Sequence, residues 1–219
     1  MRFPILFACL VLADLIAVSM ESKPLEYVFK PSLMLALGIY FFLETAKIQE
    51  KKQRNLVLTA LFFSLLGDVF LMFPNGFILG LAAFLVGHLF YIFAFMLDNR
   101  GFIFSKWDRL VYAVGILVYG VVFLSIVVPK VNVDLKMPIV AYGLTILVML
   151  LTVFNRWKNV GNETFKWVLI GAILFVISDS LIAISRFVQP FPMSGIAIML
   201  TYSAGQFLIV KGVLAKLNA

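Results

Sequence analysis

The 219-residue chain has one histidine, one cysteine and few charged residues, which make up 13% of the sequence. A single cysteine, Cys9, excludes an intramolecular disulfide and a multi-cysteine metal site. A single histidine, His88, excludes a histidine-rich zinc centre, and no HExxH motif is present. The sequence also lacks a P-loop, a glycine-rich dinucleotide motif and the GxSxG motif of serine hydrolases. We therefore expect no metal and no cofactor.

Long apolar runs take the place of these motifs. Hydrophobic residues make up 63% of the chain, and the mean hydropathy is +1.06, whereas soluble domains are about half apolar. Eight runs come close to the ~20 residues that cross a bilayer core. We predict an all-α, polytopic membrane helix bundle of about eight transmembrane helices, in a single domain over residues 1–219. The expected spans are roughly 3–20, 30–46, 55–73, 76–97, 108–128, 137–154, 165–187 and 194–213.

The net charge of +7 comes from Lys and Arg residues that separate the apolar runs. A nucleic-acid-binding protein gathers such residues on one soluble face, so we expect no nucleic acid partner. Thirteen Lys and Arg residues fall on the side of the N-terminus and five on the other side. Because the positive side is cytoplasmic, we expect both termini in the cytoplasm. The predicted location is a plasma (inner) membrane, with the lipid bilayer as a partner.

Two helical hairpins have similar patterns. Phe-Pro at 73–74 precedes Gly-His at 87–88 by 14 residues, and Phe-Pro at 191–192 precedes Gly-Gln at 205–206 by the same interval. An Asp lies in the apolar run before each Phe-Pro. The pattern suggests two four-helix halves related by an axis along the membrane normal.

Three carboxylates lie inside the expected spans: Asp14, Asp68 and Asp179. At a span centre, each costs about 2.5–3.5 kcal/mol on insertion scales, and such residues usually face the bundle interior. All three fall about 8–12 Å from the outer ends of their helices. If Asp68 and Asp179 share a cavity, one can hold a proton while the other stays ionised, as acid/base catalysis needs. We predict both as catalytic residues; alternatively, buried carboxylates only lock helices together.

Further polar residues lie at similar depths. Ser64 precedes Asp68 by one helical turn, and the lone histidine shares a helix face with Tyr91. The histidine either contacts substrate or makes an interhelical hydrogen bond. Lys-Pro at 30–31 is expected to open the second helix at the outer surface, where the lysine either contacts lipid phosphate or points into the cavity. The predicted substrate-binding residues are Asp14, Lys30, Ser64, His88, Tyr91, Tyr202 and Gln206.

Five motifs carry a resemblance to a known family. They are KP at 30–31, SLLGD at 64–68, GHLFY at 87–91, ISDSL at 177–181 and TYSAGQ at 201–206. In their order and spacing, the chain resembles the YhhN family of membrane proteins, whose characterised members are lysoplasmalogenases. The resemblance covers nearly the whole chain.

The resemblance implies hydrolysis of the vinyl ether bond of lysoplasmalogen to a fatty aldehyde and glycerophosphoethanolamine or glycerophosphocholine. The partner is then a lysophospholipid. Vinyl ethers break after protonation of the β-carbon, which an aspartic acid can perform without a metal or a nucleophilic serine. The main alternative is a membrane transporter or channel that uses the intramembrane Asp residues. A metal-dependent lipid amidase and a lipid-binding protein without turnover are further alternatives.

Overall fold

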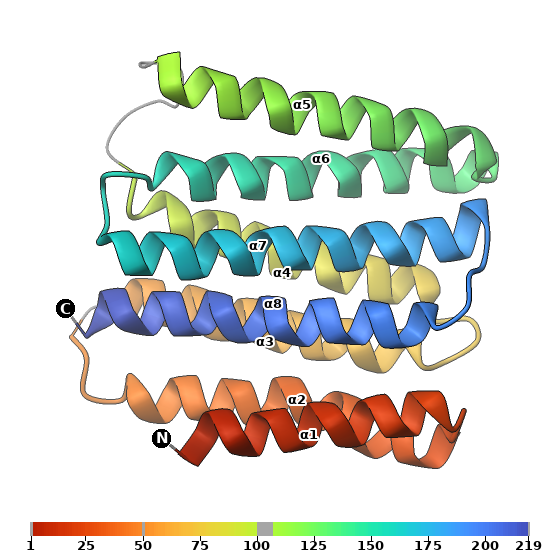
Figure 1. Ribbon diagram of the computed structural model, residues 1–219, viewed down its shortest axis with the longest axis horizontal. Coiled ribbons are helices and arrows are strands. Elements are labelled where there is room, and N and C mark those ends of the chain that lie inside the picture. Colours follow the sequence, from red (N-terminus) through yellow and green to blue (C-terminus); the bar gives the residue numbers. More distant parts are fainter. Residues whose placement is uncertain (1, 50, 100–106, 219) are drawn as a thin grey trace.

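The computed structural model describes residues 2–49, 51–99 and 107–218, and within them it contains helices and no strand. The described residues form eight α-helices, a short 3₁₀ helix, η2, and a π-helical turn, η3 (Figure 1). In chain order the elements are α1 (Arg2–Ser19), α2 (Lys23–Glu44), α3 (Lys51–Leu71), α4 (Phe77–Met96), α5 (Trp107–Val127), η2 (Val128–Lys130), α6 (Val133–Asn155), α7 (Asn162–Ala183), η3 (Ile184–Val188) and α8 (Ser194–Leu217).

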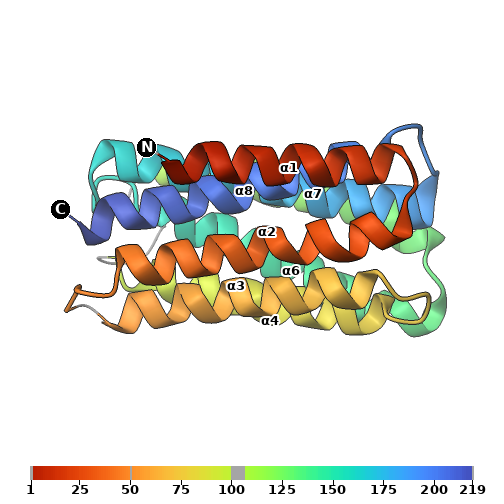
Figure 2. The same cartoon turned by 90° about the horizontal axis from the view of Figure 1, so that it is seen from below.

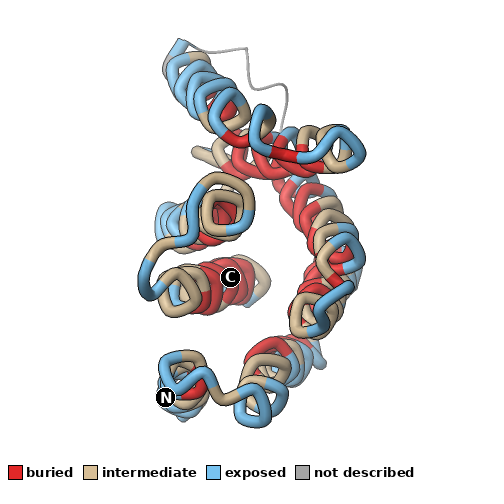
Figure 3. Tube along the Cα trace, turned by 90° about the vertical axis from the view of Figure 1, so that its right-hand side faces the viewer, coloured by how far each residue is buried: buried red, intermediate tan, exposed pale blue. Residues whose placement is uncertain are grey.

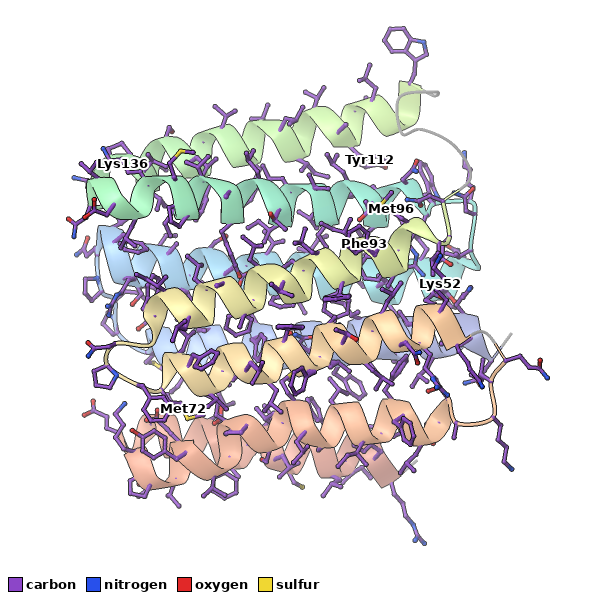
Figure 4. The ribbon with its side chains drawn as sticks, turned by 180° about the vertical axis from the view of Figure 1, so that it is seen from behind. Lys52, Met72, Phe93, Met96, Tyr112 and Lys136 are labelled. Carbon is purple, nitrogen blue, oxygen red and sulfur yellow. The ribbon has the colours of Figure 1, made fainter. Side chains whose placement is uncertain are left out.

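The described part of the chain has eight helices that are long and apolar enough to cross a membrane, which confirms the predicted all-α bundle. Both termini lie at the same end of the bundle (Figure 1), as an even number of spans requires. Lys52 and Lys136, assigned to opposite sides of the membrane, lie at opposite ends (Figure 4). Arg100, Lys106 and the side chain of Arg109, counted on the side of the N-terminus, lie outside the described residues. Which end faces the cytoplasm stays a prediction.

The prediction that Lys30 and Pro31 open the second helix is wrong. Helix α2 begins at Lys23, and Pro24 lies in its first turn, where the missing N–H of proline has no intrahelical partner to lose. Pro31 lies inside the helix. A membrane helix tolerates such a proline because its neighbours satisfy the freed carbonyl. Lys30 is therefore about 10 Å from the start of α2, seven residues along the helix, and it is half-buried.

Six helices form a ring in the order α2, α3, α4, α6, α7, α8, and α8 returns to contact α2. Helix α1 packs against α2 and α8 (Figure 2), and α5 packs on α6 (Figure 1). In the end-on view, buried residues line the sides of the helices that face inward, while many outward positions are exposed (Figure 3). In the predicted repeat, α2 corresponds to α6 and α8 corresponds to α4. The contact between α2 and α8 therefore has its counterpart in the contact between α6 and α4. The repeat itself stays a prediction.

Within each of the two hairpins, α3–α4 and α7–α8, the two helices pack closely at glycine residues. A Cβ atom on Gly205 would lie 2.9 Å from the carbonyl oxygen of Gly171, and one on Gly171 would lie 2.7 Å from that of Gly205. In α4, a Cβ atom on Gly87 would lie 3.2 Å from the carbonyl oxygen of Ala60. Small residues at such contacts let membrane helices approach and gain packing energy. Each hairpin is therefore a compact unit that carries its polar side chains toward the other.

Candidate active site

The two carboxylates predicted as catalytic bind residues of opposite hairpins. Asp68 of α3 accepts a hydrogen bond from the hydroxyl of Tyr202 on α8, at 2.8 Å. Asp179 of α7 lies beside His88 of α4, with Oδ2 and Nε2 3.2 Å apart. All four side chains are buried. Each carboxylate thus stands on the first helix of one hairpin and meets the second helix of the other.

The contact between His88 and Asp179 brings two buried polar atoms together. Nδ1 of His88 lies 2.7 Å from the backbone oxygen of Phe84. A carbonyl oxygen only accepts hydrogen bonds, so Nδ1 carries a hydrogen, and in neutral imidazole Nε2 is then an acceptor. Nε2 faces a carboxylate oxygen, which is also an acceptor when ionised. Neither atom has a hydrogen-bond partner within the described residues, and a proton shared between them would give each atom one.

Three more predicted site residues form a hydrogen-bond chain between the hairpins. The hydroxyl of Tyr91 donates to Oε1 of Gln206 at 2.5 Å, and Nε2 of Gln206 donates to the hydroxyl of Ser64 at 2.9 Å. All three residues are buried. Such interhelical bonds contribute about 0.6 to 2 kcal/mol each in membranes. The chain fixes the position of α8 relative to α3 and α4.

Aromatic rings lie between the two carboxylates. The ring of Tyr202 contacts Phe84 edge-to-face, with centroids 5.8 Å apart, and Phe175 with centroids 5.5 Å apart. Phe175 in turn contacts the ring of His88 at 4.6 Å. No hydrogen bond joins Asp68 to Asp179 directly in the described structure, so this aromatic layer separates the two carboxylates.

An apolar cavity opens beside Asp179. Side chains of α4, α6 and α7 form most of its wall, and Phe123 of α5 extends it outward. Among the described residues that line it, Asp179 supplies the one carboxylate and Tyr142 the one hydroxyl. Asp68 is not part of this wall. The cavity therefore offers an acidic group to an apolar molecule, while Asp68 stands behind Phe84 and Tyr202.

A second polar group lies around Asp68. Asp14 of α1 is 1% exposed, and neither of its carboxylate oxygens has a hydrogen-bond partner within the described residues. Lys30 acts electrostatically on both Asp14 and Asp68, and Asp14 acts on Asp68. Because α2 begins at Lys23, Lys30 lies within the helix rather than at its start, and it is half-buried. Its ammonium group partly neutralises the two carboxylates.

Sequence reasoning missed a buried ionic cluster at the end of the bundle that holds the termini. Asp98 Oδ2 accepts hydrogen bonds from Nε of Arg156 at 2.8 Å and from Nε2 of Gln53 at 2.9 Å, and Lys216 lies 3.4 Å from Oδ1. Burial lowers the pKa of the Arg156 guanidinium, and the adjacent carboxylate opposes this shift. From the sequence alone, Arg156 and Lys216 are interpreted only as charges that orient the protein in the membrane. No local pattern joins them to Asp98, which is 58 residues from Arg156.

Comparisons with known proteins support the family resemblance that the sequence motifs indicate. Lysoplasmalogenase TMEM86B of Homo sapiens is 35% identical over 156 residues, which cover 71% of this chain and 62% of that protein. Lysoplasmalogenase of Mycobacterium tuberculosis (strain CDC 1551 / Oshkosh) is 28% identical over 171 residues, covering 74% of this chain and 61% of that protein. The chain thus spans about three fifths of the length of these relatives. No solved structure matches the chain.

A family model matches residues 25–213, from the first turn of α2 to near the end of α8. This range includes both hairpins and every predicted site residue except Asp14. The chain therefore belongs to the YhhN family, as its sequence motifs predicted.

Proposed function

We propose that the chain hydrolyses the vinyl ether bond of a lysoplasmalogen, releasing a fatty aldehyde and a glycerophosphoethanolamine or glycerophosphocholine, without a metal. Relatives named lysoplasmalogenase support this class of reaction. The observation that carries the proposal is the buried contact between Nε2 of His88 and Oδ2 of Asp179 at the wall of an apolar cavity, two atoms that a shared proton would satisfy. Cleavage of a vinyl ether begins with transfer of a proton to carbon, and an acid that faces an apolar molecule can supply it.

In this proposal, Asp179 is the general acid. Its proton is transferred to the β-carbon of the vinyl ether, and the positive charge that results is shared by the α-carbon and the ether oxygen. His88 keeps its hydrogen bond to Phe84 and holds the carboxyl group in place. The apolar wall receives the first part of the alkyl chain, which needs no polar partner.

In this proposal the rings of Phe84 and Tyr202, which separate Asp68 from the Asp179 cavity, move aside when substrate binds, so that Asp68 completes the reaction on the side of the vinyl ether opposite Asp179. A water molecule adds its oxygen to the α-carbon and gives a proton to Asp68, which forms a hemiacetal. The hemiacetal then collapses, the bond to the glycerol oxygen breaks, and the aldehyde leaves. The glycerol oxygen takes up the hydroxyl proton of the hemiacetal, and the proton on Asp68 returns to Asp179 before the next turnover. Tyr202 orients Asp68 through its hydrogen bond.

The remaining predicted residues support the two acids. Lys30 and Asp14 set the charge around Asp68, and a cation at the outer end of the bundle binds the substrate phosphate. Two cations are candidates for that role, Lys30 and Arg186. Ser64, Tyr91 and Gln206 hold the hairpins at the spacing that the substrate needs.

The test is aldehyde release from lysoplasmenylethanolamine by purified protein in detergent. We expect Asp179→Asn and Asp68→Asn each to lower turnover by about 100-fold or more, because each removes a proton-transfer group. Asp134→Asn is the matched control, since Asp134 is exposed in the first turn of α6. Each variant is compared at equal amounts of folded protein, and treatment with EDTA should leave turnover unchanged.

Turnover at the wild-type rate in both Asp variants would refute the catalytic assignment. Loss of activity after EDTA treatment, with recovery on addition of a metal, would refute the metal-free mechanism. Proton or ion flux in proteoliposomes with no aldehyde release would instead favour the transporter that the intramembrane carboxylates also suggest.

A further inference from the structure

Arg186 lies at the rim of the cavity that contains Asp179. It belongs to η3, the π-helical turn that follows α7, and its side chain is exposed. The guanidinium carbon lies 5.0 Å from the ring centroid of Phe77. The rings of Phe77 and Phe187 meet edge-to-face with centroids 5.5 Å apart, and both line the cavity. The positive charge therefore stands beside two aromatic residues of the cavity wall.

The guanidinium has no ionic partner in the structure. Within the described residues, no ion pair or hydrogen bond involves the Arg186 side chain, and its contact is the ring of Phe77. A guanidinium that stacks on a ring keeps its N–H groups free at the edge, in the fork geometry that matches a phosphate. Arg is always charged at neutral pH. The edge of this side chain is thus available to an anionic group.

Lys30, the other candidate cation, is placed differently. It lies inside the bundle, where the carboxylates of Asp14 and Asp68 both act electrostatically with it. A phosphate at Lys30 would meet two carboxylates together with one ammonium group, and it would lose the water that hydrates it. Arg186 has neither disadvantage, because it is exposed and unpaired.

The spacing between Arg186 and Asp179 suits a lysophospholipid. Seven residues separate them along α7 and η3, which is about 10 Å along a helix axis. In a lysoplasmalogen, about seven covalent bonds separate the vinyl β-carbon from the phosphorus, or ~8 Å when extended at the bond lengths of an extended chain. A phosphate at Arg186 therefore brings the reacting carbon to the depth of Asp179, and the alkyl chain continues toward Phe123 of α5.

The local sequence explains why the arginine stands at this point. The N–H of Gln189 bonds to the carbonyl of Ile184 at 2.9 Å, which forms the wide π-helical turn, and Pro190 follows. Proline cannot continue the hydrogen-bond ladder, so the chain leaves the helix directly after the turn. Such turns inside or after α-helices are frequent at functional sites.

We infer that Arg186 is a substrate-binding residue that recognises the phosphodiester of a lysophospholipid at the mouth of the Asp179 cavity, with Phe77 as the platform on which its guanidinium rests. The inference depends on the proposed function for the identity of the lipid. The inference can be tested separately from the proposed function, because binding of a phosphodiester at this rim requires no turnover.

The experiment measures binding of two non-hydrolysable lipids to the full chain in phospholipid-free detergent, by calorimetry. One lipid is 1-O-alkyl-glycerophosphoethanolamine, and the other is 1-O-alkyl-glycerol, which has no phosphate. We expect Arg186→Gln to weaken binding of the phospholipid by about 10-fold or more, as loss of a charge-assisted hydrogen bond does. Binding of the alkylglycerol should be unchanged. Arg186→Lys, which keeps the charge without the fork, should lie between wild type and Arg186→Gln.

Lys23→Gln is the matched control. Lys23 is an exposed cation at the same end of the bundle and makes a surface contact with Glu26 at 3.6 Å, so its removal should change neither affinity. In turnover assays, Arg186→Gln should raise KM for lysoplasmenylethanolamine by a similar factor and leave kcat nearly unchanged.

Two results would overturn the inference. The first is wild-type protein that binds both lipids equally, or an Arg186→Gln variant that weakens both by the same factor. The second is a variant that binds both lipids as wild type does and loses thermal stability only in phospholipid nanodiscs, because the guanidinium then binds a bilayer phosphate. A wild-type protein that shows the expected phosphate selectivity but releases no aldehyde supports the inference and refutes the proposed function.

Discussion

Replacing Asp98 by alanine leaves the guanidinium of Arg156 buried without its carboxylate. Arg156 is 0% exposed, and its Nε donates to Asp98 at 2.8 Å. Removing one partner of a buried ion pair costs about 3–5 kcal/mol, because the remaining charge is uncompensated. In the variant, Gln53 keeps its bond to the carbonyl of Ala94, and Lys216 keeps its bond to Gln53 and is partly exposed. These two residues therefore add less than Arg156 to the loss of stability.

The expected fall in stability can be expressed as a melting temperature. For a chain of this size, 1 kcal/mol corresponds to about 2–4 °C in Tm. Asp98→Ala should therefore lower Tm by about 6–20 °C, measured by intrinsic tryptophan fluorescence in detergent micelles. Asp134→Ala, which removes an exposed carboxylate, should leave Tm within about 2 °C of wild type.

A double variant tests the physical reason. If the cost is the uncompensated charge on Arg156, then Arg156→Met in the Asp98→Ala background should restore a large part of the lost Tm, because it replaces that charge with an apolar side chain of similar length. Additive losses in the double variant would refute this explanation. A Tm for Asp98→Ala equal to that of wild type would show that the cluster contributes nothing to stability.

Three further changes have defined outcomes. Gly205→Ala should destabilise the α7–α8 hairpin by about 1–3 kcal/mol, as overpacking does. Gly115→Ala is the control, because a Cβ atom there meets nothing within 4 Å, and it should leave Tm unchanged or slightly raised. Equal effects of the two changes on Tm would contradict the packing argument. Tyr91→Phe should cost about 1–3 kcal/mol, since it leaves the buried Oε1 of Gln206 unpaired, and a raised KM with unchanged Tm would instead indicate contact with substrate. Pro31→Ala restores a helix hydrogen bond and should raise Tm; a Tm equal to or below that of wild type would contradict this argument.

The membrane helices follow from the sequence because burial in lipid demands long apolar runs, which few other folds contain. The start of α2 did not follow, since Lys-Pro occurs twice, at 23–24 and at 30–31. Either pair satisfies the rule that proline favours the first turn. The residues between them, LEYVF, are apolar enough to continue the helix but include one Glu, which made the later start look equally acceptable.

The identity of the candidate site residues followed from their polarity inside apolar runs, but their partners did not. The bond between Asp68 and Tyr202 joins positions 134 residues apart. Each residue turns a helix by about 100°, so a boundary error of two residues moves a side chain to the opposite face. Pairing also depends on how the helices order themselves in the ring, for which the sequence holds no local signal. Asp98 was missed for a related reason, because charges near helix ends normally face water.

The similar hairpins explain how two equivalent acids can take different roles. In the predicted repeat, His88 and Gln206 occupy the same position, 14 residues after a Phe-Pro pair. Asp179 lies beside the histidine and also interacts with the hydroxyl of Tyr142, whereas Asp68 accepts from Tyr202, and Gln206 bonds elsewhere. A tyrosine hydroxyl donates to an ionised carboxylate without giving it a proton. In the proposed mechanism, the imidazole at one of these matching positions and the amide at the other distinguish the acid Asp179 from the base Asp68.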